Sequence, residues 1–330
     1  MTVKLAINGF GRIGRNIVRC AVENIRKDIQ IVAINDLASV ETNAHLLKYD
    51  SIHGKFPRDI CTNKSTINAG VGEMKIFACE DPRDLEWANI DIVLECTGKF
   101  TSKEKAELHL KNGSKRVLIS APATDVTKTI AFGVNHSSLD SSDRVVSNAS
   151  CTTNCMAPVT KVLHENIGIK RGFMTTIHSY TGDQPTLDHG HKDLYRTRAA
   201  AINMIPTSTG AAKAVGLVIP ELIGKIDGVA IRVPTPNVSC IDFTFETVRP
   251  TTAEEINAAM HNASTGALNG VLATTDEKLV SMDFNHDSHS SIFATDQTKV
   301  VDDTFCRVLS WYDNEWGFSN RMLDTAKEMS

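Results

Sequence analysis

Short apolar runs alternate with helical segments along the first half of the chain. In the first helical segment, Ile13, Ile17, Ala21 and Ile25 recur on one face, and residues 103–111 form a second, charged helical segment. Strands that alternate with helices in this way predict an α/β fold with a doubly wound parallel sheet. We place its buried strands at Val3 to Ile7, Ile29 to Ile34, Ile90 to Leu94, Arg116 to Ile119 and Arg144 to Val146.

The second half of the chain has a different pattern. Residues 240–246 alternate strictly, with Ile241, Phe243 and Phe245 on one face, which is typical of an antiparallel sheet with one solvated side. Further strands are predicted at 173–177, 229–233 and 306–312, and a surface helix at 253–263. The last helix is amphipathic, and its apolar side carries Phe318, Met322, Ala326 and Met329.

A chain of 330 residues exceeds what one hydrophobic core usually supports, so we expect two domains. The first covers residues 1–150 and is joined by the C-terminal helix at 315–330. The second covers residues 151–314 and is an α+β domain with a mixed or antiparallel sheet.

The composition argues against a nucleic-acid-binding, metal-binding, disulfide-bonded or membrane protein. Lys and Arg number 35 and Asp and Glu 39, so the net charge is −4, and without any basic run a nucleic-acid partner is not indicated. The eight cysteines include one close pair, Cys151 and Cys155, but no CxxC, which predicts reduced thiols and no metal site. The N-terminus lacks the layout of a signal peptide, and no apolar stretch approaches a membrane span. We expect a cytoplasmic protein with no membrane partner.

The segment Asn8–Arg15 contains the pattern G-x-G-x-x-G between a predicted strand and a predicted helix. In this context Gly9 permits a tight turn, Gly11 lets the backbone approach a pyrophosphate, and Gly14 allows close packing of helix and strand. Asp36 follows Gly14 by 22 residues, where a carboxylate accepts from ribose hydroxyls and repels a 2′-phosphate. The sequence thus predicts NAD in preference to NADP; FAD and a turn without a ligand are the alternatives.

Cys151 lies where an apolar run ends and a helix-compatible segment begins. The free N–H groups and the dipole of a helix N-terminus favour the thiolate, which is the form that attacks a carbonyl carbon. His178 ends a predicted strand 27 residues later, a length that returns the chain beside Cys151 after one helix and one strand. A structural cysteine and a structural histidine are the alternatives. With a nicotinamide cofactor, the pair predicts a thiohemiacetal that loses hydride to give a thioester.

Residues suited to binding oxyanions follow His178 in two clusters. Arginines, and hydroxyl groups beside glycine amides, are typical ligands of phosphate groups. Two clusters suit a phosphorylated substrate and an attacking inorganic phosphate, although each arginine alone fits a surface residue. They comprise Lys192, Arg196 and Arg198, and then Ser208–Ala211 with Arg232.

With these residues in view, the chain resembles the phosphorylating glyceraldehyde-3-phosphate dehydrogenases of glycolysis over essentially its whole length. The resemblance implies oxidation of D-glyceraldehyde 3-phosphate, with NAD and inorganic phosphate, to 1,3-bisphosphoglycerate and NADH. It also implies a homotetramer and an S-shaped loop at about 181–201 near a neighbouring subunit's cofactor. The motifs that carry it are Asn8–Arg15, Ser120–Pro122, Ala149–Cys155, Ser208–Ala214, Arg232–Val238 and Trp311–Glu315.

The same resemblance implies a role for individual residues. Cys151 would be the nucleophile, and His178 the base that also activates the thiol. The substrate phosphate would be held by Thr181 and Arg232, with Arg198 shared near the two anion sites. Inorganic phosphate would be bound by Ser150, Thr152, Thr209 and Gly210. Cofactor contacts are implied for Gly9, Gly11, Arg12, Ile13, Asp36, Ser120 and Asn314, the last of which would hold the nicotinamide carboxamide.

Three positions depart from the family pattern. Glu80 stands where many relatives carry an arginine near the adenine, Phe318 replaces a tyrosine near the nicotinamide, and His189–Gly190 replaces a Leu-Pro pair of some strictly NAD-dependent relatives.

Two other functions remain open from the residues. The string Asp283–Asp287 also occurs in relatives of the erythrose-4-phosphate dehydrogenase type, whereas the segment from Ser208 favours the phosphate-accepting enzyme. A non-catalytic NAD-binding protein is an alternative of another class, against which the intact Cys151 and His178 argue. We expect Cys155 to be a packed helix residue.

Overall fold

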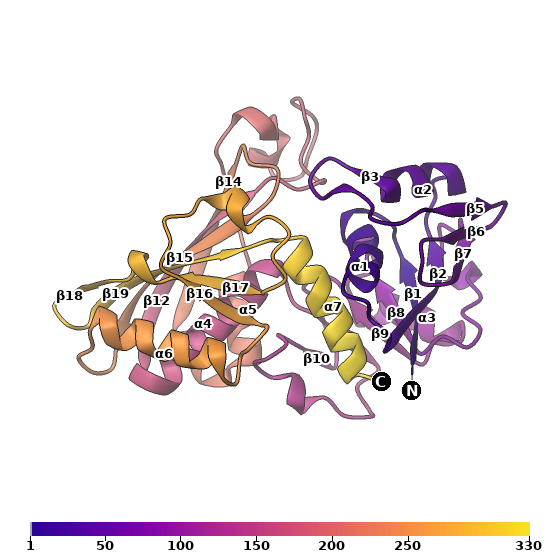
Figure 1. Cartoon of the computed structure of the whole chain (residues 1–330). Helices are drawn as coiled ribbons and strands as arrows, with labels where there is room; N and C mark the ends of the chain where they lie inside the picture. Colours follow the sequence, from indigo (N-terminus) through magenta and orange to yellow (C-terminus); the bar gives the residue numbers. More distant parts are fainter. Residues whose placement is uncertain (1) are drawn as a thin grey trace. The chain divides into compact units, whose positions relative to one another are not determined.

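The computed structural model describes residues 2–330. The chain divides into two compact units, and Figure 1 shows their helices and strands coloured along the sequence. The first unit holds the residues up to Phe132 together with His136–Ser150 and Ser319–Ser330, and the second holds Gly133–Asn135 and Cys151–Phe318. No helix within residues 2–330 is both long enough and apolar enough to cross a membrane.

A nine-stranded sheet forms the centre of the first unit. Its order is β10-β11-β9-β8-β1-β2-β7-β6-β5, in which the strands from β10 to β7 run parallel and β5 and β6 form an antiparallel edge. The strands are β1 (Val3–Asn8), β2 (Ile29–Asn35), β5 (Cys61–Asn63), β6 (Thr66–Asn68), β7 (Glu73–Phe77), β8 (Ile92–Glu95), β9 (Arg116–Ile119), β10 (Lys128–Thr129) and β11 (Val145–Ser147). The prediction of a parallel, doubly wound sheet is confirmed.

Helices α1 (Arg12–Glu23), α2 (Val40–Lys48) and α3 (Lys103–Lys111) belong to this unit, as does a short pair formed by β3 (Tyr49–Asp50) and β4 (Gly54–Lys55). Ile17 and Ala21 on α1 are buried as predicted, but the placement of Ile25 on the same face is wrong. The helix ends at Glu23, and Ile25 is 62% exposed with a φ of 51°. This left-handed residue turns the chain toward β2, and the N–H of Arg26 donates to the carbonyl of Ala21 at 3.0 Å.

A mixed sheet forms the centre of the second unit. Its order is β13-β14-β12-β15-β19-β17-β16, and β18 also pairs with β19. The side chains of Ile241, Phe243 and Phe245 on β15 are buried, which confirms the alternation read from the sequence. The strands are β12 (Ile169–Ser179), β13 (Ile205–Ser208), β14 (Ile226–Val233), β15 (Ser239–Thr247), β16 (Leu272–Thr275), β17 (Ser291–Ala294), β18 (Lys299–Val301) and β19 (Phe305–Tyr312).

Helix α4 (Cys151–Ile167) packs against β17 and β19 and contacts α5 (Ala211–Val218) and α6 (Ala253–Thr265). The last helix, α7 (Trp316–Glu328), carries the predicted apolar side, on which Met322 and Ala326 are buried. Strand β12 pairs in parallel with β14, and this register places His178 directly beside Arg232. The sheet thus fixes the two side chains that dominate the site described next.

Candidate active site

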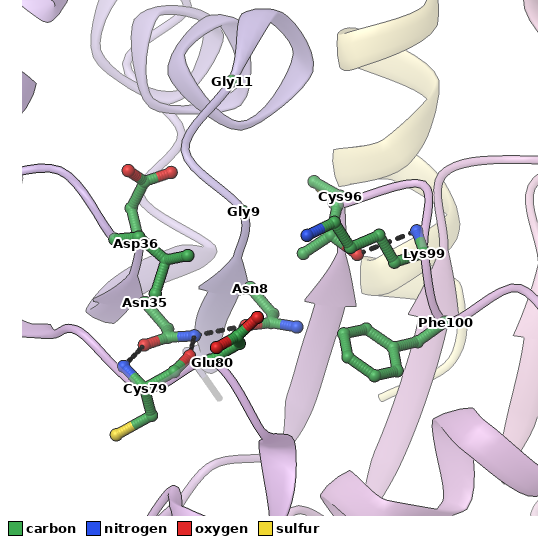
Figure 2. A pocket seen from close by; sticks show the side chains of 12 residues that line it. Asn8, Gly9, Gly11, Asn35, Asp36, Cys79, Glu80, Cys96, Lys99 and Phe100 are labelled. Carbon is green, nitrogen blue, oxygen red and sulfur yellow. Dashed lines mark hydrogen bonds between the residues drawn. The ribbon is translucent and has the colours of Figure 1, made fainter. Parts of the chain in front are cut away.

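A pocket of about 290 Å³ opens in the first unit at the carboxyl ends of β1, β2, β7 and β8. Figure 2 shows the side chains that line it. This is the edge of a doubly wound sheet where nucleotide ligands bind. The lining residues are Asn8, Gly9, Gly11, Asn35, Asp36, Leu37, Cys79, Glu80, Cys96, Thr97, Lys99 and Phe100.

The glycines of the G-x-G-x-x-G motif fit a dinucleotide. Gly9 has a φ of 94°, and a Cβ there would lie 2.8 Å from the nitrogen of Thr97. A Cβ on Gly14 would lie 2.3 Å from the carbonyl oxygen of Gly9, so both positions exclude a side chain. A Cβ on Gly11 would meet no atom within 4 Å, and Gly11 caps α1 without a side-chain hydrogen bond. This open space before a helix N-terminus fits a pyrophosphate.

The carboxylate of Asp36 is held in one orientation. Its Oδ2 accepts from the N–H of Phe10 at 2.9 Å, and its Oδ1 accepts from the N–H of Ala38 at 2.9 Å. A carboxylate oxygen accepts more than one hydrogen bond, so the remaining lone pairs can receive ribose hydroxyls. Glu80 lines the same pocket and makes no hydrogen bond or ion pair within residues 2–330.

A buried polar network lies beside this pocket. Glu95 is fully buried, and its Oε2 accepts from Asn8 Nδ2 at 2.6 Å and from His109 Nε2 at 3.0 Å. Trp87 Nε1 donates to His109 Nδ1 at 2.9 Å, so the neutral imidazole carries its proton on Nε2. Glu95 Oε1 accepts from the N–H of Thr97 at 2.8 Å. The network fixes Asn8 and Thr97, two residues of the pocket wall.

Sequence reasoning missed this network. A glutamate at the end of a buried strand was the available signal, because a charged side chain there requires partners.

The other residues predicted to contact the cofactor do not line the pocket. The guanidinium of Arg12 forms an ion pair with Asp50 at 2.5 Å, and its backbone N–H lies in the first turn of α1. Ile13 follows it in that turn. Ser120 comes directly after β9, and its N–H donates to the carbonyl of Glu95 at 3.0 Å. Asn314 belongs to the second unit.

In the second unit, Cys151 and His178 are brought together. Cys151 is the first residue of α4, and His178 lies one residue before the end of β12. The distance from Cys151 Sγ to His178 Nε2 is 3.5 Å. A nucleophile and a base within such reach form the core of a covalent catalytic site.

Burial sets the protonation of this pair in the ligand-free chain. It raises the pKa of the Cys151 thiol above its ordinary value, although the charge of Arg232 and the N–H groups at the start of α4 act in the opposite direction. Desolvation and the charge of Arg232 lower the pKa of His178 to about 3. The thiol and imidazole are therefore both neutral near pH 7. This direction differs from the sequence-based expectation of a thiolate, which counted the helix N-terminus but not burial.

Arg232 reaches this pair from the neighbouring strand. Its Nη1 lies 2.8 Å from His178 Nδ1, donates to the carbonyl of Ser179 at 3.0 Å and approaches Thr181 Oγ1 at 3.3 Å. Its Nε is buried and has no hydrogen-bond partner among residues 2–330. A guanidinium that keeps one nitrogen without a partner, and that reaches the Thr181 hydroxyl with another, is suited to an anion.

The N-termini of α4 and α5 lie close together. The hydroxyl of Thr153, in the first turn of α4, donates to the carbonyl oxygen of Ala211, the first residue of α5, at 3.4 Å. Gly210 caps α5, and the Thr209 hydroxyl accepts from the N–H of Ala211 at 3.1 Å. The Thr152 hydroxyl is instead buried against the hydroxyl of Tyr312 at 2.8 Å. Thr152 can therefore serve an anion through its N–H group, next to Ser150 in the chain.

Arg198 is not brought into contact with Arg232. It forms an ion pair with Asp188 at 3.0 Å, and both side chains are largely exposed. The expectation that Arg198 is shared near two anion sites has no counterpart in its present contacts.

Asn314 is buried, and its side-chain oxygen accepts from the hydroxyls of Ser179 and Ser239, each at 2.9 Å. These two bonds orient the amide so that its NH₂ group is the end left to donate. Asp313 supports the segment by accepting from the N–H groups of Glu315 at 2.9 Å and Trp316 at 2.8 Å. The roles of these serines and of Asp313 were not found from the sequence.

Comparisons with known proteins agree with this geometry. Residues 3–103 match the family model of the glyceraldehyde 3-phosphate dehydrogenase NAD binding domain, and residues 150–314 match that of its C-terminal domain. A glyceraldehyde-3-phosphate dehydrogenase of Cereibacter sphaeroides is 64% identical, and one of Xanthobacter flavus is 61% identical; each alignment covers 100% of this chain and 99% of the relative. The plasmid-encoded one of Cupriavidus necator is 54% identical over 99% of this chain and 98% of the relative.

The fold and the two sites are those of a nicotinamide-dependent oxidoreductase. The chain belongs to the glyceraldehyde 3-phosphate dehydrogenase family, as matches over both halves and along the whole length show. The predicted resemblance, the fold class and NAD as the cofactor are confirmed.

Proposed function

We propose that this chain catalyses the phosphorylating oxidation of D-glyceraldehyde 3-phosphate in glycolysis, with NAD and inorganic phosphate as the other substrates. The products are 1,3-bisphosphoglycerate and NADH. The relatives compared above carry the name of this enzyme, which supports the reaction over the erythrose-4-phosphate alternative.

The chemistry rests on Cys151 and His178. His178 Nε2 accepts the thiol proton as Cys151 Sγ attacks the aldehyde carbon, and it returns this proton to the former carbonyl oxygen, which gives a thiohemiacetal and a neutral imidazole. NAD, when bound, supplies the hydride acceptor. His178 also receives the hydroxyl proton as the carbon is oxidised to the thioester. Inorganic phosphate then attacks the thioester carbon and releases the thiol, so that the acyl group leaves as a mixed anhydride.

The remaining predicted residues bind the substrates in this proposal. Arg232 and Thr181 hold the substrate phosphate through the guanidinium and hydroxyl described above. The groups at the N-termini of α4 and α5, from Ser150, Thr152, Thr209 and Gly210, bind inorganic phosphate, and Arg198 assists after leaving Asp188. The cofactor is held by Gly9, Gly11, Arg12, Ile13, Asp36, Ser120 and Asn314.

The single observation that carries the proposal is the 3.5 Å approach of Cys151 Sγ to His178 Nε2 beside Arg232, whose Nε has no hydrogen-bond partner among residues 2–330. The test is NADH formation from glyceraldehyde 3-phosphate with and without inorganic phosphate. We expect strong dependence on phosphate, and arsenate should replace it. Turnover without phosphate, and preference for erythrose 4-phosphate, would favour the sister enzyme.

The proposed organisation follows the same family. The residues 1–150 with the helix 315–330 form the NAD-binding domain, and residues 151–314 the catalytic domain with its S-shaped loop at 181–201. The loop and the residues directly after it expose large apolar side chains, which supports assembly into a homotetramer, and we place this assembly in the cytoplasm. Sedimentation of the purified chain tests the assembly, and a monomer would contradict it. The exposed side chains are Leu187, Leu194, Tyr195, Ile202 and Met204.

A further inference from the structure

Two fully buried polar side chains, Trp87 and His109, belong to the network beside the cofactor pocket but do not line the pocket. Trp87 Nε1 can only donate, and it lies 2.9 Å from Nδ1 of His109. Nδ1 is therefore the accepting nitrogen, and the ring carries its proton on Nε2, which lies 3.0 Å from Oε2 of Glu95. The indole thus holds the imidazole in the tautomer that donates to a buried carboxylate.

The hydrogen bonds continue from Glu95 along the wall of the pocket. Oε2 of Glu95 accepts from Asn8 Nδ2 at 2.6 Å, and Oδ1 of Asn8 accepts from Asn35 Nδ2 at 2.7 Å. The side-chain amide of Asn35 also pairs with the backbone of Cys79, at 2.8 Å through its oxygen and 2.9 Å through its nitrogen. Figure 2 shows these links of Asn35 to both neighbours. One chain of bonds therefore joins the carboxyl ends of β8, β1 and β2 to the segment after β7.

The other oxygen of Glu95 fixes the loop that follows β8. Oε1 accepts from the N–H of Thr97 at 2.8 Å and from the Thr97 hydroxyl. The same hydroxyl accepts from the N–H of Lys99 at 3.0 Å. This loop lies against Gly9, since a Cβ there would be 2.8 Å from the nitrogen of Thr97. Glu95 therefore holds the loop against the glycine turn that precedes α1.

His109 contacts the pocket wall through its ring as well. The ring lies edge-on to that of Phe100, with the centroids 6.4 Å apart and an angle of 77° between the planes. Phe100 is the one aromatic residue among those that line the pocket in the described part of the chain, and Figure 2 shows its ring. The same imidazole thus contacts the carboxylate of the network and this aromatic side chain.

The charge of Glu95 makes the network sensitive to the loss of a donor. No lysine or arginine among residues 2–330 forms an ion pair with this carboxylate, and His109 supplies one of its hydrogen bonds. A buried carboxylate without a cation depends on the number and geometry of the groups that donate to it. Loss of the N–H of His109 would leave Oε2 with Asn8 alone, so that the carboxylate and the pocket residues bonded to it would shift.

We propose that Trp87 and His109 are positioning residues for the cofactor, which hold the wall of the NAD pocket in its binding geometry through Glu95 and Phe100. A wall that is ordered before NAD arrives loses less conformational freedom on binding, so the affinity is higher. Loss of the contacts of His109 therefore weakens NAD binding, whereas the thiol site in the other unit keeps its own contacts. The binding measurements below depend on the cofactor alone, and the turnover measurements rest also on the proposed function.

The test measures NAD binding by calorimetric titration and turnover at steady state, both on the full chain. His109→Leu should raise the Kd and the KM for NAD at least about tenfold, because the buried carboxylate loses a donor. The kcat at saturating NAD, and the KM for glyceraldehyde 3-phosphate, should stay within about twofold. A protein that was merely less stable would lose active chains, and thus kcat, without a change in KM.

Three further variants separate the hydrogen bonds from packing. His109→Gln places an amide N–H near the position of Nε2 and should return the Kd for NAD to within about threefold of the natural chain. Trp87→Phe removes the donor to Nδ1 but leaves Nε2 beside Glu95, so its Kd should lie between those of the two His109 variants. Leu110→Ala is the matched control: Leu110 follows His109 on α3 and packs against a separate apolar cluster. It should lower the free energy of unfolding by urea and leave the Kd unchanged.

The positioning role would be overturned if His109→Leu bound NAD as tightly as the natural chain, or if His109→Gln bound it no better than His109→Leu. It would also be overturned if Leu110→Ala weakened NAD binding as much as His109→Leu, or if His109→Leu lowered kcat at an unchanged KM for NAD. A natural chain that binds NAD but forms no NADH would contradict the proposed reaction alone, and calorimetry would still decide the role of His109.

Discussion

The cofactor pocket of the first unit and the thiol site of the second unit differ in how completely their polar groups are hydrogen-bonded. Beside the pocket, Glu95 accepts from Asn8, His109 and Thr97, and both oxygens of Asp36 accept backbone N–H groups. At the thiol site, Nδ1 of His178 lies close to both the carbonyl oxygen of Ser179 and Nη1 of Arg232, and Arg232 Nε has no hydrogen-bond partner among residues 2–330.

This difference in hydrogen bonding agrees with the function proposed for each site. A cofactor that is bound and released unchanged in shape gains from a pocket whose walls are already fixed, because little ordering is left to oppose binding. A site that must move protons needs groups with two available states.

Replacing the nucleophile should separate the two sites most completely. Cys151→Ser should lower NADH formation by about 10⁴-fold or more, because a neutral hydroxyl attacks far less readily than a thiol. Binding of NAD, followed by fluorescence titration, should change by less than about threefold, since Cys151 does not line the pocket. Cys155→Ser is the matched control one turn along α4; Cys155 is buried against Ser291 and should leave turnover intact. Equal losses in both variants would contradict the assignment.

The protonation of the thiol site gives the second prediction. Burial raises the pKa of Cys151 above its ordinary 9.0, so in the ligand-free chain the thiol is protonated at pH 7 and loses its proton only as the pH rises. Alkylation by iodoacetamide should accelerate about a hundredfold from pH 7 to pH 9. With the pKa of His178 lowered to about 3, no second inflection should appear between pH 5 and pH 8. A plateau beginning below pH 8 would mean that the helix N-terminus and Arg232 outweigh burial.

The network beside the cofactor pocket should be sensitive to the loss of one charge. Glu95→Gln replaces an oxygen that accepts hydrogen bonds with a group that donates, and it leaves buried donors on its neighbours unpaired. We expect a loss of about 2–4 kcal/mol in the free energy of unfolding by urea, together with weaker NAD binding. Glu104→Gln, at the exposed start of the helix that carries His109, is the control. A stability equal to that of the control would show that the network is not a support of the pocket.

The smallest effects concern the two carboxylates that line the pocket. Asp36→Asn should improve binding of NADP relative to NAD by about tenfold, because the negative charge that repels a 2′-phosphate is removed from a fixed position. Glu80→Gln should change the same ratio by only about twofold, since Glu80 is exposed and held by no partner within residues 2–330. Both ratios are measured by titration of nucleotide binding. A larger effect at Glu80 would place the main selectivity outside the motif.

The sequence was informative wherever local pattern and chain connectivity decide the structure. The five predicted strands of the first sheet and the alternation on β15 follow from side-chain periodicity, and the 27-residue spacing correctly brought Cys151 and His178 together. The strands β5, β6, β7 and β10 were not predicted because few of their residues are buried, so they lack the continuous apolar run that marks the equally short β8, β9 and β11. Ile25 was misplaced because the end of α1 depends on a left-handed turn and not on hydrophobicity.

The direction of pKa shifts and the pairing of charged side chains were harder to predict from the sequence. The direction of the Cys151 pKa depends on burial by residues remote in sequence, which no local motif reports. Two ion pairs were also missed, because no local pattern reports that their partners lie close together in the folded chain. They join Arg198 to Asp188 and Arg12 to Asp50. The network around Glu95 likewise joins strands separated by 87 residues.

The segment Ser319–Ser330 completes the first unit although it follows the second unit in the chain. Asn320 accepts from Asn24 at 2.6 Å, Asp324 pairs with Arg26 at 2.7 Å, and Thr325 donates to Asn148 at 2.8 Å. During translation these partners in the first unit stay uncovered until nearly all of the second unit has been synthesised. The unit that is synthesised first is therefore completed only after the other, and a nascent chain stalled before Ser319 would leave the binding surface of this helix open to chaperones and proteases.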